Sequence, residues 1–281
     1  MVQKLLNKRH LVIATMHKKE RVIAPIIQDA FQVFCSVPEL NTDLLGTFSG
    51  EVKRRDSALK TARKKCALAM SQSSVDLAIS SEGSFGPHPT IPFANANEEI
   101  VLLLDRKYGL EVIGKHLTHE TNFNGKLVES IEEAMEFTQN VGFPSHAVII
   151  RESESTSHII AKGITDSHTL LGLLSSHFEH QKTVWIETDM RALFNPTRMK
   201  AIEKATLHLI EKLKSACPKC SMPGFWATDY RSGLPCSLCH SPTQSTLASI
   251  WTCSACGYTE ERTFPHQKYE EDPMYCDVCN P

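Results

Sequence analysis

Cysteines in the last quarter of the chain carry its most specific chemical signal. Eight of the ten cysteines form four C-x-x-C pairs, each able to present two thiolates from one tight turn. The pairs are Cys217/Cys220, Cys236/Cys239, Cys253/Cys256 and Cys276/Cys279. Two such turns complete a tetrahedral site of four thiolates, the usual closed arrangement for structural Zn²⁺. We therefore expect two structural zinc ions, neither with an open coordination position for catalysis.

The way in which the four C-x-x-C turns combine is open to three pairings. The stretch LPCSLCHSPTQSTLASIWTCSACGYTEE resembles a zinc ribbon, in which a short β-hairpin bridges two metal-binding turns. This resemblance favours the second turn with the third and the two outer turns with each other. Sequential pairing, in which the first turn joins the second and the third joins the fourth, is almost as well supported as the ribbon pairing. His240 and His266 are spare ligands, but eight cysteines suffice, so both are expected to be surface histidines.

The turn that follows the first apolar run is rich in groups that could bind phosphate. It reads Thr15-Met16-His17-Lys18-Lys19-Glu20 and leads into a helical pattern, so its lysines and the helix N-terminus could receive an anion. The candidate ligands in it are Thr15, His17, Lys18 and Lys19. The turn lacks the glycines of a P-loop, and a solvated turn ahead of a helix is the alternative.

A second passage combines carboxylates with arginines just past an apolar run that predicts a strand. Glu187 and Asp189 lie on the same side of an extended segment and could bind Mg²⁺. Arg191 and Arg198 could hold an anionic substrate. A structural ion-pair cluster is an equally good interpretation of the same residues.

Between these passages, the stretch from Ser80 to Pro89 is rich in glycine and proline and carries Glu82 and His88. We expect a loop at the end of a strand, which is a common position for ligand-binding groups in α/β sheets. Basic residues that precede it could form an anion-binding rim, although a solvated helix face is the ordinary explanation. They are Lys53, Arg54, Arg55, Lys60, Arg63, Lys64 and Lys65.

An α/β domain over residues 1–215 is expected to position these groups, because strand patterns alternate with helical patterns. Two of the strand patterns flank Arg-Lys-Tyr-Gly and predict a hairpin, so we expect a mixed sheet flanked by helices. Residues 216–281 are expected to form a small zinc-ribbon-like module. The expected strands cover 11–15, 76–80, 99–105, 110–114, 147–151 and 183–187, and the expected helices cover 18–31, 57–70, 130–140 and 195–213.

Composition narrows the classes of function only slightly. The chain is 41% hydrophobic and 22% charged with a formal net charge of -2, which is typical of a globular protein and indicates no particular partner. No apolar run approaches the roughly 20 residues that cross a bilayer, and the N-terminal apolar segment is interrupted by polar residues. We expect no membrane segment and a cytoplasmic location, since paired cysteines in an unexported chain favour metal binding. Lysine and arginine are sparse in the C-terminal module, so nucleic-acid binding is not favoured there.

Several short motifs are spread along the whole chain, namely SEGSFGPHP, FPSHA, ETDMRA, NPTRM, the C-x-x-C turns and the terminal CNP. Through them the chain resembles an uncharacterised bacterial-type family described only as a domain of unknown function. This resemblance implies no activity.

Residues 11–215 are also similar to the inosine/xanthosine triphosphate pyrophosphatases and the Maf-like nucleotide pyrophosphatases. IATMHKKE resembles their first strand and phosphate loop, and SALKTARKKC resembles their basic helix. AISSEGSFG resembles their strand and acidic loop, and NPTRMKAI their late threonine-arginine turn. The resemblance implies their fold, with Glu82 as the first catalytic candidate and Arg198 on the nucleotide phosphates.

The leading functional expectation is a Mg²⁺-dependent hydrolase of a nucleotide or another phosphorylated small molecule. Glu82, with Glu187 or Asp189, would bind the metal ion. The side chains expected to neutralise phosphate charge are Lys18, Lys19, Arg63 and Arg198. The alternative is a non-catalytic zinc-ribbon protein that binds protein or nucleic-acid partners, and the oligomeric state stays open.

Overall fold

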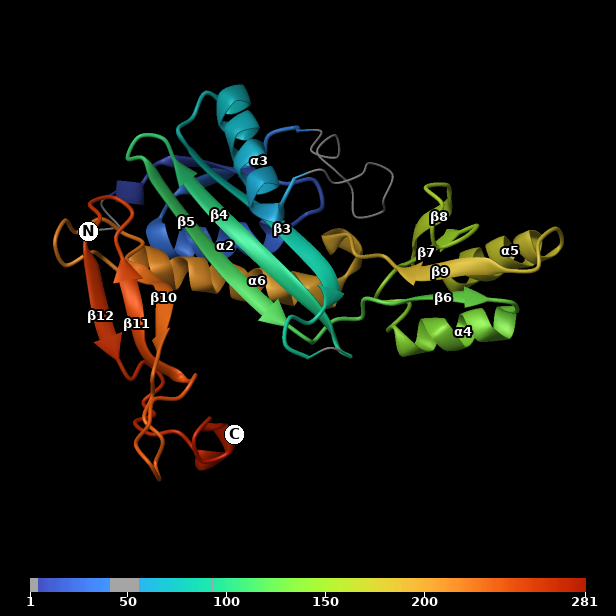
Figure 1. The fold of residues 1–281 in the computed structure, drawn as a ribbon. Coiled ribbons are helices and arrows are strands. Elements are labelled where there is room, and N and C mark those ends of the chain that lie inside the picture. The colour runs from blue at the N-terminus through green and yellow to red at the C-terminus, as the bar shows by residue number, and fades with distance from the viewer. Residues whose placement is uncertain (1–4, 41–55, 92) are drawn as a thin grey trace.

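The computed structural model describes residues 5–40, 56–91 and 93–281. Figure 1 shows two β-sheets with their helices and a C-terminal module, with the long helix α6 (Pro196–Lys214) between the second sheet and that module. Within these described ranges, none of the helices combines the length and the apolar composition that a membrane crossing requires.

The first sheet has five strands in the order β2-β1-β3-β4-β5. β1 is parallel to both of its neighbours, whereas β3, β4 and β5 form an antiparallel meander, so the expected mixed sheet and its hairpin are present. The strands are β1 (His10–Ala14), β2 (Phe34–Ser36), β3 (Leu77–Pro87), β4 (Asn95–Asp105) and β5 (Leu110–Thr118). β3 is longer than expected, because residues 81–87 pair with β4 and continue the strand through the stretch expected to be a loop.

Helices cover both faces of this sheet (Figure 1). α2 (Glu20–Phe31) and α6 pack on one face, against apolar side chains such as Ile13, Ile79 and Leu103. α3 (Ala58–Ser73) packs on the other face, where small residues of the helix allow a close approach to the strands. Successive side chains along each strand point to opposite faces of the sheet and therefore pack into two separate core layers.

A second sheet is inserted between β5 and α6. It has four antiparallel strands in the order β6-β9-β7-β8, and its core is separate from that of the first sheet. The strands expected at 147–151 and 183–187 belong here, so the strands predicted for one sheet are divided between two. The elements are β6 (Gly125–Val128), α4 (Ile131–Asn140), β7 (Val148–Arg151), β8 (Ile159–Ile164), α5 (Ser167–Phe178) and β9 (Val184–Thr188).

Side-chain caps explain where three helices begin. Asn195 Oδ1 accepts a hydrogen bond from the Arg198 backbone N–H at 2.9 Å, and Pro196 is the first residue of α6. Ser57 caps α3 and Ser130 caps α4 in the same way, at 3.3 and 3.2 Å. These starts agree with the expected helix starts to within a residue or two.

The C-terminal module is a three-stranded antiparallel sheet that docks on the end of α6. Its strands are β10 (Trp226–Ser232), β11 (Thr246–Thr252) and β12 (Thr259–Thr263). The Gly224 N–H donates to the Lys212 carbonyl at 3.1 Å, and the Trp226 and His208 rings lie 5.5 Å apart. The module is therefore fixed to the last turns of the helix.

Candidate metal centres and a buried polar niche

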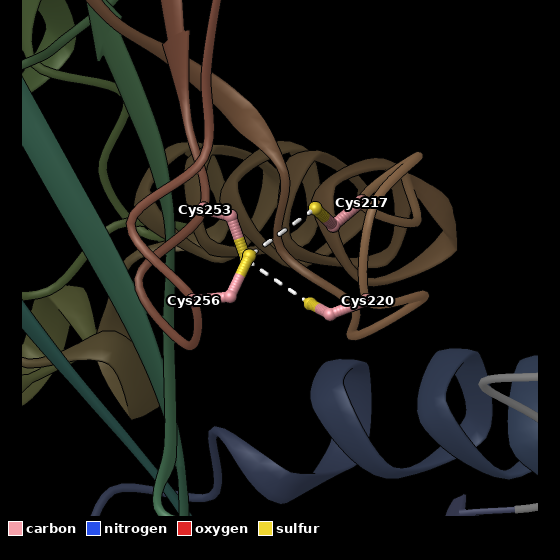
Figure 2. A group of neighbouring side chains, drawn as sticks. All are labelled: Cys217, Cys220, Cys253 and Cys256. Atoms are coloured by element: carbon pink, nitrogen blue, oxygen red, sulfur yellow. Dashed lines mark hydrogen bonds between the residues drawn. The ribbon is translucent and has the colours of Figure 1, made fainter.

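The eight paired cysteines form two groups of four, and in each group the sulfur atoms lie within 4.8 Å of one another. Figure 2 shows the group nearer to α6, the proximal group, in which Cys217 and Cys256 have sulfurs 3.8 Å apart and Cys220 and Cys253 have sulfurs 3.6 Å apart. Four thiolates around Zn²⁺ at about 2.3 Å would be separated by about 3.8 Å, so the spacing fits a tetrahedral metal ion. Each group can hold a metal ion such as zinc.

The second group, the distal group, lies at the other end of the three-stranded sheet. It joins Cys236 with Cys279 at 3.8 Å and Cys239 with Cys276 at 3.6 Å between sulfurs. Hydrogen bonds from Ser241 lower the pKa of the Cys239 thiol to about 6, which favours the thiolate form that metal ions bind.

The pairing that we favoured from the sequence is wrong, and so is the sequential alternative. The first turn joins the third and the second joins the fourth. Successive turns are separated by β10, β11 and β12 in order, and each antiparallel strand carries the chain to the opposite end of the sheet. Alternate turns therefore meet at the same end. His240 and His266 are exposed and belong to neither group, as expected for surface histidines.

Apart from the cysteines, polar groups gather where β3 runs past the end of β1. β1 ends at Ala14, which pairs with Ser80, so the edge of β3 is open beyond that point. The turn that leads into α2 crosses this edge, and Lys19 donates from Nζ to the Ser81 carbonyl at 2.8 Å. We call the surroundings of Lys19 the polar niche. It lies at the carboxyl end of β1, a frequent ligand position in α/β folds.

Two buried ion pairs flank Lys19 on opposite faces of the sheet. Glu82 pairs with Lys65 of α3 at 2.5 Å, and Glu99 of β4 pairs with Arg198 Nε at 2.7 Å. The Glu99 and Arg198 side chains are both 0% exposed. Because side chains alternate along a strand, the registers of β3 and β4 direct Glu82 toward α3 and Glu99 toward α6.

Gly83 makes room for the Glu99 carboxylate. The two residues face each other across β3 and β4, and a Cβ atom on Gly83 would lie 2.3 Å from Glu99 Oε1. Any side chain at this position would therefore compete with the carboxylate for the same space.

Several buried polar atoms around the niche have no hydrogen-bond partner within the part of the chain that the structure describes. Most buried polar groups in proteins are hydrogen-bonded, so such a gathering indicates a position for an ion, water or ligand. The register of the sheet aligns the strands that carry most of these atoms, because Gly83 of β3 pairs with Glu99 of β4, and Glu99 pairs with His116 of β5. The atoms are Thr15 Oγ1, Ser81 Oγ, Asn97 Oδ1, Glu99 Oε2 and His116 Nε2.

The pKa of Lys19 is lowered to about 7, chiefly because the amine is buried and secondarily because Arg198 is positively charged. Glu82 and Glu99 act in the opposite direction and raise it. The Lys19 side chain is therefore close to the balance between ammonium and amine near neutral pH, and a bound anion would stabilise the ammonium form.

A cavity of about 500 Å³ lies between the start of β4 and the second sheet. Met190 lines it, and its carbonyl accepts a hydrogen bond from Arg198 Nη1. Phe123 also lines it and stacks on Phe85 at 5.6 Å, while the Arg198 guanidinium lies 5.3 Å from the Phe85 ring. Arg198 of the niche is thus in direct contact with a residue of the cavity wall.

The carboxylates predicted at 187 and 189 have arginine partners of their own. Glu187 lines the cavity, where it accepts hydrogen bonds from Arg151 at 2.8 Å and Trp185 at 2.9 Å. Asp189 is fully buried and accepts hydrogen bonds from Nε and Nη2 of the Arg191 side chain, the shortest at 2.6 Å. The structure therefore puts these carboxylates in ion pairs separate from that of Glu82.

Only some of the residues predicted to bind phosphate lie in the niche. Thr15, Lys19 and Arg198 belong to the niche, whereas Lys18 is exposed and His17 is half-buried. Arg63 lies on the outer side of α3 and pairs with Glu111 at 2.6 Å. Three residues of the predicted basic rim, Lys53 to Arg55, lie outside the described residues.

Sequence reasoning missed Glu99, although a signal for it exists. Glu99 precedes Val101 and Leu103 at the spacing of one strand face, so a carboxylate stands where the pattern expects an apolar side chain. An acidic residue in the buried register of a strand indicates a buried cation nearby, and Arg198 supplies it.

A protein-family model described as "Domain of unknown function (DUF6671)" matches residues 65–281. The match begins within α3 and covers β3, β4 and β5 of the first sheet, the whole second sheet, α6 and the whole C-terminal module. No curated protein matches the chain.

Proposed function

The chain belongs to the family described as a domain of unknown function (DUF6671), as the motifs in its sequence predict, and we propose that its α/β part is a metal-dependent phosphohydrolase. Its substrate is a nucleotide or another phosphorylated small molecule. The observation that carries the proposal is the polar niche, where buried charges and partnerless polar atoms meet beside a cavity.

The charges of the niche favour an anion. Among the described residues, Glu82 pairs with Lys65 and Glu99 pairs with Arg198, whereas the Lys19 ammonium donates to a backbone carbonyl rather than to a carboxylate. A phosphate group beside Lys19 would supply a negative charge and raise the pKa of the amine. Lys19 and Arg198 then hold and neutralise the phosphate oxygens.

Mg²⁺ fits this donor set as a companion of the phosphate. Hard divalent cations prefer carboxylate and hydroxyl oxygens. Because Glu82 and Glu99 point to opposite faces of the sheet, one Mg²⁺ takes only one of these carboxylates, and we assign it to Glu82. A bare Mg²⁺ would be repelled by the nearby Lys19, Lys65 and Arg198, so we expect the metal ion to enter together with the phosphorylated substrate. When bound, Mg²⁺ polarises a phosphoryl oxygen and withdraws charge from it.

The cavity is suited to the organic part of the substrate. Trp185 and Phe123 provide aromatic surface, and the Arg151–Glu187 pair provides donors and acceptors at its wall. Most of the other side chains in its wall are polar, so the cavity suits an organic group that carries hydrogen-bonding atoms as well as a ring.

The resemblance to inosine/xanthosine triphosphate pyrophosphatases supports the same proposal. The turn before α2, the end of β3 and the start of α6 are the segments that carry the resemblance, and residues of all three surround Lys19. A fold of that kind is part of the proposal.

We also propose that both cysteine groups hold Zn²⁺ as structural ions. Four thiolates at tetrahedral spacing leave no position for a reacting water molecule. These metal ions stabilise the C-terminal module, and the chemistry belongs to the niche.

A substrate panel tests the enzymatic proposal. Nucleoside di- and triphosphates, including inosine and xanthosine forms, are incubated with the zinc-loaded chain and Mg²⁺ or Mn²⁺, and released phosphate and pyrophosphate are measured. Glu82→Gln is expected to lower kcat by at least about 100-fold, because it removes a carboxylate at the metal position. Glu203→Gln, on the exposed side of α6, is the matched control and is expected to leave the rate unchanged. Absence of turnover by a folded, metal-supplied sample would contradict the proposal.

A further inference from the structure

The distal cysteine group carries large apolar side chains that point to solvent. Leu238 is 70% exposed and Val278 is 65% exposed, although each lies between two cysteines of the group. Met274 and Tyr275, just before Cys276, are both 59% exposed. We call these four residues with their cysteines the distal tip.

The proximal group is an internal comparison, because it is built from the same C-x-x-C turns. The third position of each turn is Lys219 and Ala255 in the proximal group, and Leu238 and Val278 in the distal group. All four positions are exposed. Metal binding by such a turn therefore does not require a large apolar side chain at this position, and the distal tip has two.

Packing within the module does not use the distal tip either. The module has its own core around the proximal group, formed by Phe225, Trp251 and Tyr258 with the cysteines. Large apolar side chains that cluster at the surface without a packing role are typical of sites for protein contacts.

The surroundings of the distal tip are acidic. From Lys268 to Cys279 the chain has one lysine against four carboxylates, a formal net charge of −3. Lys268 is already paired with the buried Glu271, so Glu270, Asp272 and Asp277 remain as the exposed carboxylates. Four thiolates around a divalent ion add further negative charge. This charge repels nucleic acid and anionic lipid, and it attracts cationic polypeptides.

We propose that the distal tip is a docking surface for a segment of a partner protein that carries apolar side chains flanked by lysine or arginine. The apolar side chains of the segment cover Leu238, Val278, Met274 and Tyr275, and its cations meet the acidic rim. The proposal is independent of the phosphohydrolase activity, since it uses no residue of the polar niche.

Peptide selection on the full-length, zinc-loaded chain tests this proposal. A random 12-residue displayed library is selected on the wild-type chain, and each round is counter-selected on the Leu238→Ser/Val278→Ser double variant. Both positions are exposed, so zinc content and circular dichroism of the variant are expected to match the wild type. The matched control is Lys219→Ser/Ala255→Ser, which changes the same turn position in the proximal group.

Enriched peptides are expected to combine Leu, Ile, Phe or Trp with Lys or Arg. In fluorescence polarisation, synthetic copies are expected to bind the double variant at least tenfold more weakly than the wild type, and to bind the control variant equally well. Any of three results would overturn the proposal: no enrichment over the double variant, enriched peptides without basic residues, or equal binding to the double variant. Self-association in sedimentation analysis that the double variant abolishes would identify a second copy of the chain as the occupant instead.

Discussion

At the scale of single residues, the close approach of Gly83 to Glu99 determines whether the buried ion pair between Glu99 and Arg198 can form. The Glu99 carboxylate lies over the β3 backbone only because Gly83 has no side chain. Its position is fixed by Arg198, and both side chains are shielded from solvent. The carboxylate cannot move aside without separating a buried ion pair, which is strongly unfavourable.

Gly83→Ala is therefore expected to lower the free energy of unfolding by about 1–3 kcal/mol, the usual cost of overpacking a core. Gly86→Ala is the matched control, because a Cβ atom there would meet nothing within 4 Å. Urea unfolding of both variants measures the difference. Equal stability of the two variants would show that Glu99 relocates freely.

Four residues of the niche could be predicted from the sequence, whereas Glu99 could not. Thr15, Lys19, Glu82 and Arg198 stand at the ends of well-marked elements, so their positions could be expected to be functional. Glu99 lies inside a strand, and only the pairing of β4 with β3 reveals that it meets Arg198. Such a contact between residues 99 positions apart depends on register, which local patterns do not contain.

At the scale of elements, strand reversal determines how the cysteines combine. Each spacer between C-x-x-C turns contains one strand of an antiparallel meander, and alternate turns therefore share an end of the sheet. The resemblance to a zinc ribbon led to the wrong pairing because it rested on a single hairpin between the second and third C-x-x-C turns. The module instead has three strands, β10, β11 and β12.

Cysteine double variants test this pairing by zinc content. Cys236→Ser/Cys276→Ser removes two ligands of one group, so the chain is expected to retain one zinc ion. Cys236→Ser/Cys253→Ser removes one ligand from each group and is expected to weaken both sites. Native mass spectrometry and elemental analysis count the ions. The opposite result, with more zinc retained by the second variant, would support the ribbon pairing.

Helices and strands differ in how well local sequence predicts them. α6 begins where Asn195 and Pro196 predict, since capping is a local interaction. The extension of β3 to Pro87 was missed because glycine and proline are typical of loops, and only pairing with β4 holds this stretch as a strand. The division of the strands into two sheets likewise follows from tertiary contacts.

At the scale of the whole molecule, the C-terminal module is expected to depend on metal ions for its folding, whereas the α/β part has cores of its own. The two sheets are supported by extensive apolar clusters, whereas the module has a single small one. Structural zinc sites contribute on the order of 10 kcal/mol to folding, which a small core cannot replace.

Removal of zinc is therefore expected to unfold residues 216–281 and leave the α/β part folded. Limited proteolysis after treatment with a chelator, followed by mass spectrometry of the fragments, measures this. The cuts are expected after Cys217, and readdition of Zn²⁺ is expected to restore resistance. Early cuts within the first sheet would show instead that the module supports the α/β part.

Helix α6 also sets the distance between the two ends of the molecule. Arg198 lies in its first turn and Cys217 follows its last, and its 19 residues at about 1.5 Å each make a rod of about 28 Å. Figure 1 shows the second sheet beyond one end of this rod and the C-terminal module at the other. A short segment held at the distal tip would lie at the other end of this rod from the niche and would not contact it. If the proposed docking holds, the segment would act as an anchor. It would raise the local concentration of the niche around the partner protein and change where the niche works rather than how fast.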